Sequence, residues 1–209
     1  MYISQISLGT YFCDPIMFLI RSVFYLIIPF SFVLVSFGQV VSVDKVKFTS
    51  LQDDWLMSEV QISTGINALP GATSKRFVEN VGVRLYLGFK NTNLKSGIEY
   101  FYSEVTALIL ERGDKNTVRF YIPGKIMEMN RYNKPQYYYA EIVVNQIPVE
   151  PRSRAFSSAF QNKDNLKNFV KKAKAGSFKN LGRLLPSYLS PLSVVGSDPG
   201  APAYLRIKN

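Results

Sequence analysis

The amino-acid sequence predicts a mainly β protein, an antiparallel β-sandwich with a basic amphipathic helix packed on or beside it. Between residues 40 and 147, apolar and polar residues alternate with a period of two, and turn-forming residues separate the runs. After Pro151 the apolar residues recur with the 3.6-residue period of a helix. Because no helical crossover separates the runs, we expect antiparallel sheets that pack as a sandwich, with a small barrel as the alternative.

Six runs have the pattern of strands. The run at residues 81–90 predicts a half-buried strand, because every second residue is apolar. Its inner face is expected to carry Val81, Val83, Leu85, Leu87 and Phe89. The other predicted strands cover residues 40–48, 56–63, 99–111, 117–122 and 136–147.

Turn residues predict how these strands are joined. Gly113 and Asp114 predict a turn that joins residues 99–111 and 117–122 in a hairpin. Asn145 and Gln146 predict a turn before Ile147 and Pro148. Residues 125–133 predict a short helical turn.

The C-terminal helix is predicted from one apolar stripe. Leu166, Phe169, Val170 and Ala173 fall at i, i+3, i+4 and i+7, with Asp164 as the expected N-cap and Gly176 just beyond the end. We expect this helix to cover a face or edge of its own sheet, although it also has the character of a helix that lies on an anionic bilayer or docks on a partner.

Two weaker patterns follow the helix. Phe178, Leu181 and Leu185 predict a second short amphipathic turn. Residues 190–209 are rich in Pro, Gly and Ser and predict a loose tail, in which residues 204–208 have the character of an edge strand.

The N-terminal segment predicts export. Residues 22–43 contain no charged residue, Arg21 precedes them, and Ser36 and Gly38 are the small residues that a signal peptidase reads, with cleavage after Gly38. An uncleaved membrane anchor is the alternative. Either reading places the rest of the chain in the periplasm, at the outer membrane surface or outside the cell. The expected organisation is a signal peptide or anchor (1–38), a β-sandwich (39–149), a basic helical extension (150–190) and a loose tail or edge strand (191–209).

The positive charge is concentrated near the C-terminus. Residues 39–146 hold 13 Lys/Arg and 11 Asp/Glu, whereas residues 147–209 hold 11 Lys/Arg and 3 Asp/Glu. A cationic segment of this kind attracts anionic lipid or polymer, although a solvated face is the simpler interpretation. Basic residues and aromatic residues lie in different regions, so we expect no nucleic acid partner.

Catalytic and metal-binding classes are largely excluded by composition. The sequence has no His, which removes the usual general base and the commonest metal ligand. Its only cysteine, Cys13, precedes the apolar segment and would leave with a cleaved signal. We therefore expect no enzyme activity, no metal site and no cofactor.

Two sets of residues are candidates for binding. Alternate tyrosines of the two aromatic triplets could form a platform for a protein or a glycan, although cross-strand packing is the simpler interpretation; these are Tyr100, Tyr102, Tyr137 and Tyr139. The lysines on the polar side of the helix are candidates for an anionic surface; these are Lys163, Lys167, Lys171, Lys172 and Lys174.

Three segments together resemble a known family. They are residues 77–87 (FVENVGVRLYL), 99–108 (EYFYSEVTAL) and 117–123 (TVRFYIP). The chain resembles the verrucomicrobial, Akkermansia-type family of pilus-like envelope proteins over roughly residues 40–190. The resemblance implies an immunoglobulin-like sandwich, an envelope or extracellular location, and a structural or adhesive role. It implies no catalytic residues.

The leading hypothesis is therefore an exported, non-enzymatic protein of the cell envelope with a structural, adhesive or pilus-associated role, whose partner is an envelope or pilus protein or a glycan. A second hypothesis is a peripheral envelope protein that its basic helix holds to anionic lipid or polymer. A hydrolase that uses Tyr, Lys or carboxylates is a third. The oligomeric state is not predicted.

Overall fold

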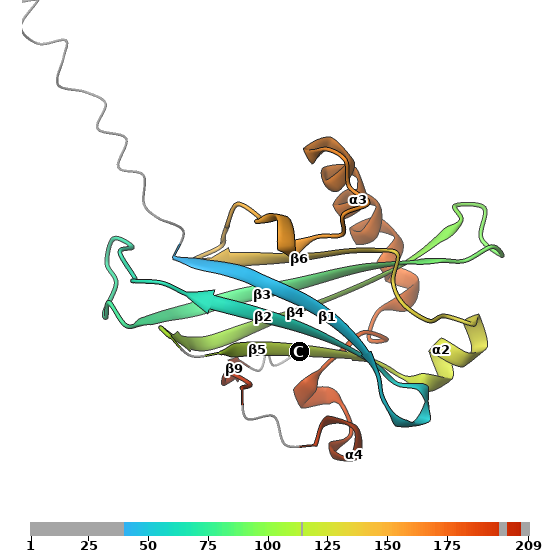
Figure 1. Ribbon diagram of the computed structural model, residues 1–209, viewed down its shortest axis with the longest axis horizontal. Coiled ribbons are helices and arrows are strands. Elements are labelled where there is room, and N and C mark those ends of the chain that lie inside the picture. Colours follow the sequence, from blue (N-terminus) through green and yellow to red (C-terminus); the bar gives the residue numbers. More distant parts are fainter. Residues whose placement is uncertain (1–39, 114, 197–199, 206–209) are drawn as a thin grey trace, which may run out of the picture. The chain divides into compact units, whose positions relative to one another are not determined.

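The computed structural model describes residues 40–113, 115–196 and 200–205, which form two antiparallel sheets that enclose a common core (Figure 1). Sheet A has the strand order β1-β2-β5-β8, and sheet B has the order β7-β6-β3-β4-β9. The strands of sheet A are β1 (Val41–Ser50), β2 (Leu56–Thr64), β5 (Asn116–Ile122) and β8 (Leu185–Pro186). Those of sheet B are β3 (Phe77–Lys90), β4 (Ile98–Glu111), β6 (Tyr137–Val144), β7 (Ile147–Pro148) and β9 (Tyr204–Leu205).

The connectivity is that of an immunoglobulin-like sandwich. β1, β2 and β5 stand in the order of immunoglobulin strands A, B and E, while β7, β6, β3 and β4 stand in the order G, F, C and C′. All the strand pairs among the described residues of these two sheets are antiparallel, from β1 with β2 to β6 with β7. The predicted antiparallel sandwich is therefore confirmed.

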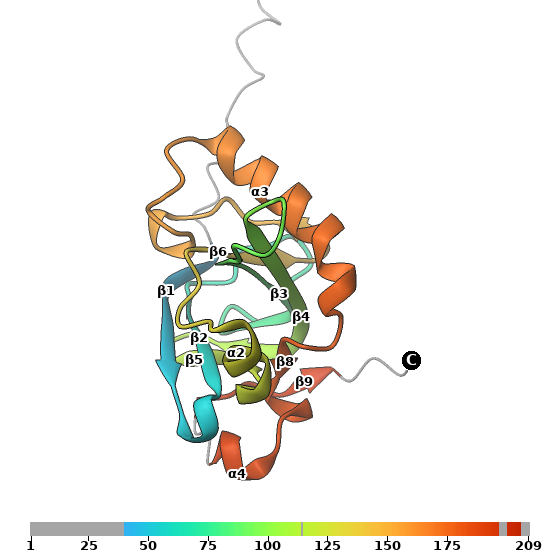
Figure 2. The same ribbon diagram turned by 90° about the vertical axis from the view of Figure 1, so that its right-hand side faces the viewer.

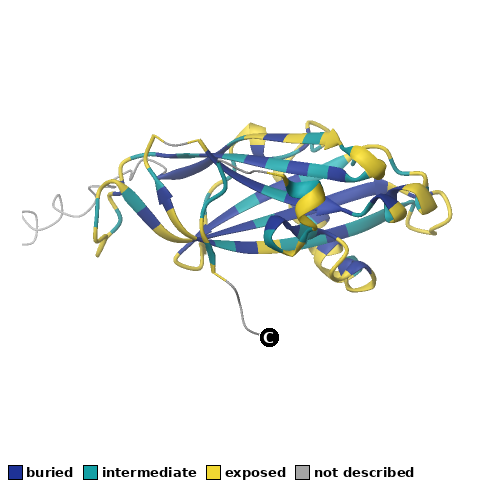
Figure 3. Cartoon of the chain, turned by 90° about the horizontal axis from the view of Figure 1, so that it is seen from below, coloured by how far each residue is buried: buried dark blue, intermediate teal, exposed yellow. Residues whose placement is uncertain are grey.

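The core is filled by the alternating residues of the facing strands. The five apolar residues predicted for the inner face of β3, from Val81 to Phe89, are all buried. They meet residues of sheet A such as Leu56, Val60 and Phe120, which are also buried. Figure 3 shows dark buried residues along the strands and exposed residues in the loops. Burial of this apolar surface is the main stabilising contribution to the fold.

The predicted hairpin between residues 99–111 and 117–122 is wrong. β4 pairs with β3 and β9, whereas β5 pairs with β2 and β8, so the connection after Glu111 carries the chain from sheet B to sheet A. A turn signal such as Gly113 establishes only that the chain changes direction. Which strand β5 pairs with depends on tertiary packing, because its apolar residues must face the core that the two sheets share.

The predicted helical turn is α2 (Gly124–Asn130), and it packs closely on the 3₁₀ helix η2 (Gln52–Asp54) between β1 and β2. A Cβ at Gly124 would lie 1.7 Å from the carbonyl oxygen of Asp53. Because no side chain fits in that space, glycine is required at this contact.

The turn predicted at Asn145 and Gln146 is confirmed. Both residues have positive φ angles, of 50° and 67°, and they join β6 to β7. The type I′ hairpin turn requires this conformation at both of its central residues, and its twist matches that of the flanking strands.

The C-terminal region consists of short helices around one longer helix. The longer one, α3 (Lys163–Gly176), buries Leu166, Phe169 and Ala173, which confirms the predicted apolar stripe. Its N-cap is Asn162, whose side chain accepts a hydrogen bond from the Asn165 backbone N–H. The predicted cap at Asp164 is therefore wrong, since Asp164 lies within the first turn. The short helices are η3 (Ser153–Ala155), η4 (Ser177–Asn180), η5 (Ser187–Leu189) and α4 (Leu192–Val195).

The predicted amphipathic turn after α3 is wrong. Phe178 is 80% exposed and Leu181 is 76% exposed, whereas Ser177 and Asn180 face the protein. The orientation is set by hydrogen bonds of the Asn180 side chain to the sheet. The predicted edge strand in the tail is confirmed over β9, which pairs with Thr106 and Ala107 of β4.

A partly buried hydrogen-bond cluster links this region to the sandwich. The Glu99 carboxylate accepts hydrogen bonds from Asn91 at 2.8 Å, from Asn180 at 2.9 Å and from the Tyr132 hydroxyl. Asn180 also donates to the Tyr100 carbonyl at 3.0 Å. Burial by itself raises the pKa of Glu99, but hydrogen bonds from Tyr132, Asn180 and Asn91 outweigh it and hold that pKa below its ordinary value.

Across residues 40–113, 115–196 and 200–205, no helix combines the length and the apolar character needed to cross a bilayer. The predicted signal peptide or anchor, residues 1–38, and the cleavage position after Gly38 lie outside the part of the chain that the structure describes.

Candidate binding groove

The outer face of sheet B, which points away from sheet A, carries a row of three tyrosines. Tyr86 of β3 lies opposite Tyr102 of β4 and Tyr139 of β6. Its ring centroid is 4.9 Å from that of Tyr102 and 5.8 Å from that of Tyr139. Rings at these separations attract one another and stabilise the sheet.

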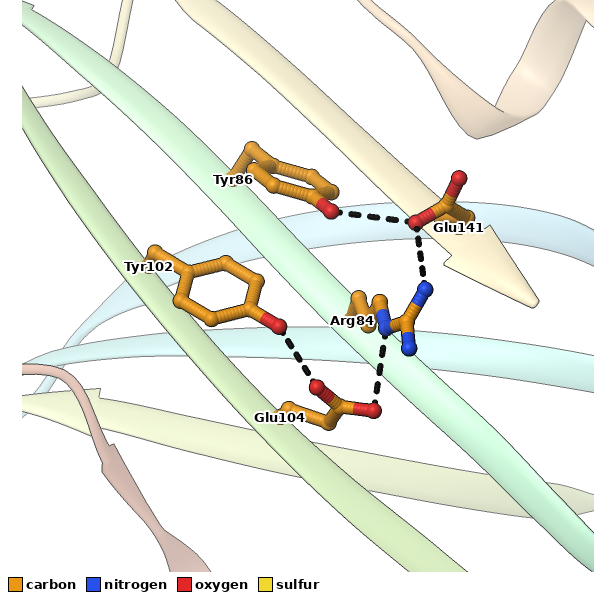
Figure 4. Close-up of polar contacts among 5 residues, drawn as sticks. All are labelled: Arg84, Tyr86, Tyr102, Glu104 and Glu141. Atoms are coloured by element: carbon orange, nitrogen blue, oxygen red, sulfur yellow. Dashed lines mark hydrogen bonds and ion pairs between the residues drawn. The ribbon is translucent and has the colours of Figure 1, made fainter. Parts of the chain in front are cut away.

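The neighbouring row is ionic and centres on Arg84. This residue lies opposite Glu104 and Glu141, as Figure 4 shows. The Arg84 Nε is 2.9 Å from Glu104, and its Nη1 is 3.4 Å from Glu141. Two tyrosine hydroxyls complete the cluster: Tyr86 donates to Glu141 at 3.0 Å, and Tyr102 donates to Glu104 at 2.6 Å.

The pKa values of Arg84, Tyr86 and Tyr102 are all raised, so these three side chains keep their protons at neutral pH. Burial raises the pKa of Tyr86, and the charge of Glu141 raises it further. Burial also raises the pKa of Tyr102, helped by its hydrogen bond to Glu104. Burial lowers the pKa of Arg84, but the hydrogen bond to Glu104 and the nearby charges outweigh this and raise it overall. Both hydroxyls therefore stay protonated and the guanidinium stays charged at neutral pH.

Helix α3 covers the next row of the same face through Phe169. Figure 2 shows α3 lying across sheet B, and its contacts are with β3 and β4. The ring of Phe169 is 5.9 Å from Tyr100 and 6.2 Å from Tyr137. Between these tyrosines lies Gly88, where a Cβ would be 3.1 Å from Phe169. The glycine therefore leaves the space that the helix occupies.

A groove of about 820 Å³ runs between α3 and the outer face of β6. The segment of residues 150–162 forms its other side. This volume lies within the range of known ligand sites. The apolar and aromatic residues that line it are Tyr139, Pro151, Phe156, Phe160, Leu166 and Val170. The charged residues that line it are Glu141, Glu150, Lys163, Lys167, Lys171 and Lys174.

The four lysines of the groove differ in their partners. Lys163 forms an ion pair with Glu150 at 2.6 Å, and the Lys174 Nζ lies 5.8 Å from the centre of the Tyr86 ring. Lys167 and Lys171 are exposed, and no carboxylate of the described residues lies within 4.0 Å of either ammonium group. Since they are four residues apart on α3, their backbones are separated by about 6 Å along the helix.

The structure brings some of the sequence-predicted site residues together and separates others. Tyr139 and four of the five candidate lysines line the groove, whereas Lys172 is exposed on α3 outside it. Tyr102 belongs to the Arg84 cluster. Tyr100 and Tyr137 are half-buried beneath Phe169, and Tyr139 is 5% exposed. The four tyrosines therefore do not form an open platform in this arrangement.

Sequence reasoning missed Arg84, Glu104 and Glu141. Each of them is two residues away from an outward-facing tyrosine on the same strand, so strand alternation places it on the same outer face. This spacing could have identified them from the sequence. Phe156 and Phe160 of the groove were missed as well, because they lie in a segment without regular periodicity.

No group of three or more His, Cys, Asp or Glu side chains that could hold a metal ion occurs within residues 40–113, 115–196 and 200–205. The groove is suited to binding, because it combines apolar and aromatic residues, a row of lysines and Glu141 of the Arg84 cluster.

Comparisons with known proteins concern the fold. No family model matches the sequence, and no curated protein matches it. Among solved structures, the chain is similar to a protein from Akkermansia muciniphila, with a TM-score of 0.55 and 15% sequence identity; the alignment covers 80% of this chain and 93% of that chain. A likeness at this identity establishes a shared fold. The resemblance in fold to a protein of Akkermansia, predicted from the strand patterns, is therefore confirmed.

Proposed function

We propose that this protein is an exported, non-enzymatic β-sandwich protein of the bacterial cell envelope that binds a partner through the groove beside α3, in a structural, adhesive or pilus-associated role. The observation that carries the binding role is the groove itself, because it joins an apolar floor to Lys167 and Lys171, which have no carboxylate of the described residues within 4.0 Å. The predicted leader supports export, and the resemblance of the strand segments to the family of pilus-like envelope proteins supports the envelope location.

Export is tested by cell fractionation followed by N-terminal sequencing of the recovered protein. A chain that begins at Gln39 in the periplasmic, outer-membrane or extracellular fraction is the expected result. An intact chain that retains residues 1–38 in a membrane fraction would indicate the anchor instead. Recovery of the protein in the cytosol would overturn the proposal.

Partner binding is tested with isolated envelope fragments. The proposed partner is an envelope or pilus protein or a glycan, and an anionic partner is favoured by Lys167 and Lys171. We expect the double variant Lys167→Gln/Lys171→Gln to retain less envelope material than the native protein. Lys172→Gln is the matched control, since this lysine is also exposed on α3 but does not line the groove. Equal retention by both variants would contradict the groove as the binding site.

A non-enzymatic role is supported by composition, because the sequence has no His, the usual general base. Burial raises the pKa of Tyr139 in the groove lining and of Tyr86 and Tyr102 on the neighbouring strands, so none of these hydroxyls acts as a base at neutral pH. Turnover of a generic glycosidase or esterase substrate that is lost in Tyr102→Phe would contradict this role.

A second candidate is a peripheral envelope protein that α3 holds to anionic lipid or polymer. The exposed lysines of α3 favour it, but the apolar stripe of α3 is buried against the sandwich, and a helix that enters a bilayer needs that stripe free. We therefore expect only salt-sensitive attraction to anionic vesicles. Co-sedimentation that persists at high salt would favour insertion and the second candidate.

A further inference from the structure

The groove combines two features that a single kind of ligand would use together. Its floor is apolar and is formed by Tyr139, Phe156, Phe160, Leu166 and Val170. Along one wall, α3 presents lysines at positions 163, 167, 171 and 174, so the wall extends for about 16 Å at 1.5 Å per residue. An elongated ligand therefore contacts apolar side chains along its length and ammonium groups at its side.

Only part of this positive charge is available to a ligand. Lys163 is paired with Glu150 at 2.6 Å, and Lys174 lies over the ring of Tyr86. Lys167 and Lys171 have no carboxylate of the described residues within 4.0 Å and are separated by one helical turn. Two ammonium groups at this spacing suit one anionic group placed between them.

The acidic side chains of the groove are already engaged. Glu150 accepts the hydrogen bond of Lys163, and Glu141 is held by Arg84 and by the Tyr86 hydroxyl. Neither carboxylate is therefore left as a free acceptor for a cationic ligand, and the net charge available to a ligand is positive.

We propose that the groove binds an amphiphile made of one hydrocarbon chain and one anionic head group, of the long-chain carboxylate class. The chain lies along Phe160, Leu166 and Val170, and the head group lies between Lys167 and Lys171. The proposal rests on the proposed function, in which the groove is the binding site. It goes beyond that function, because it assigns the groove a small-molecule ligand in addition to the envelope or pilus protein or glycan proposed as partner.

Other anionic occupants fit the observations less well. Among the described lysines that line the groove, a polyanion would find two without a carboxylate within 4.0 Å, and it would leave the apolar floor in contact with water. A phospholipid bilayer would need the apolar face of α3, which is buried through Leu166, Phe169 and Ala173.

The test is isothermal titration calorimetry of the protein as recovered from its cells, kept free of detergent, with octanoate, decanoate and laurate as probes. Burial of the chain predicts that affinity rises with length, by up to roughly fourfold for each methylene group. We expect laurate to bind about tenfold more weakly to Lys167→Gln/Lys171→Gln, and Lys172→Gln to change its affinity less than about twofold. Methyl laurate, which lacks the charge, is expected to bind as weakly to the native protein as laurate does to the double variant. Both exposed lysines can be replaced without disturbing the core, which circular dichroism checks.

Several outcomes would overturn the proposal. Equal affinity for octanoate and laurate would remove the role of the apolar floor, and laurate binding unchanged in the double variant would remove the role of the two lysines. Tighter binding of polygalacturonate or of anionic phospholipid vesicles than of laurate would assign the groove to those ligands. Self-association that the double variant abolishes, in place of laurate binding, would assign it to a second copy of the chain.

The outcomes also separate this inference from the proposed function. Loss of envelope binding in the double variant without any laurate binding would overturn the ligand class alone. Laurate binding together with envelope retention that is equal in all variants would overturn the groove as the site of the envelope partner.

Discussion

Gly88 of β3 lies beneath Phe169 of α3 in a tight contact: a Cβ there would come within 3.1 Å of the ring, so the ring would have to move by a few tenths of an ångström. The same Cβ would lie 3.3 Å from Ile98 and from Tyr137. The close packing of α3 on sheet B at this point therefore depends on the small size of Gly88.

The first prediction concerns the contact between Gly88 and Phe169. Gly88→Ala is expected to lower the free energy of unfolding by about 1 kcal/mol or more, because the added methyl group overpacks the contact with Phe169. Phe169→Ala is expected to cost about 3 kcal/mol through loss of a buried ring. Urea unfolding followed by circular dichroism measures both. Lys90→Ala, at an exposed position of the same strand, serves as the control, with a change below about 0.5 kcal/mol. A more stable Gly88→Ala variant would show that the contact is looser than described.

The second prediction is a pH dependence that arises from Glu99. The folded protein holds the pKa of Glu99 below its ordinary value of 4.5, through hydrogen bonds that outweigh burial. Because the folded pKa is depressed, the stabilisation is complete above the unfolded pKa and is lost as the pH falls through the folded pKa. Between neutral pH and about pH 3, the native protein is therefore expected to lose more stability than Glu99→Gln. Urea midpoints across this range measure the difference.

Other carboxylates with lowered pKa values, such as Glu59, are present in both proteins, so the comparison isolates Glu99. Asn180→Ala removes one of the hydrogen bonds and is expected to destabilise the protein by about 1–3 kcal/mol at neutral pH, because Glu99 and the Tyr100 carbonyl lose a buried partner. Parallel pH profiles for the native protein and Glu99→Gln would refute the assignment.

The third prediction concerns the bridge that Arg84 makes between Glu104 and Glu141. Arg84→Met is expected to destabilise the protein by about 1 kcal/mol, a value kept small because Arg84 and Glu104 are partly exposed and screened. A double-mutant cycle with Glu104→Gln measures the coupling between the two side chains. Arg84→Lys is expected to recover only part of the loss, since one ammonium group does not reproduce the forked contact with two carboxylates. Zero coupling in the cycle would show that the pair contributes nothing to stability.

The fourth prediction distinguishes the two residues at the start of α3. Asn162→Ala is expected to lower stability by about 1 kcal/mol, because its side chain accepts the hydrogen bond of the Asn165 backbone N–H. Asp164→Ala is expected to cost less than about 0.5 kcal/mol, through its favourable charge in the first turn alone. Thermal and urea unfolding of the two variants compare them directly. A larger loss in Asp164→Ala would restore the cap that the sequence pattern favours.

Much of the fold could be predicted because it is encoded locally. The strands of sheet B follow from two-residue alternation, so that Phe101 and Tyr138 point inward while their neighbours Tyr100, Tyr102, Tyr137 and Tyr139 lie on the outer face. The apolar stripe of α3 follows from helical spacing in the same way. These patterns need no knowledge of distant residues.

The candidate site was only half predicted. Tyr139 and the lysines of α3 could be named as binding candidates from their types and spacing, and the structure brings them to one groove. Phe156 and Phe160, which line the groove opposite α3, could not be predicted because their segment has no regular periodicity. The Arg84 cluster could not be predicted because its three charged residues come from three strands, and only the strand register decides which side chains meet.

The sequence by itself determined where strands, turns and the long helix lie and which side of each is apolar, since hydrophobic periodicity and turn chemistry act between near neighbours. Only the tertiary structure decided that β5 pairs with β2 instead of β4, that Phe178 is exposed while Asn180 faces the sheet, and that α3 stands beside β6 with a groove between them. Each of these features depends on contacts between residues far apart in the chain, such as Glu99 with Asn180. Each also depends on how both sheets and α3 pack into one core, and patterns among neighbouring residues do not specify that packing.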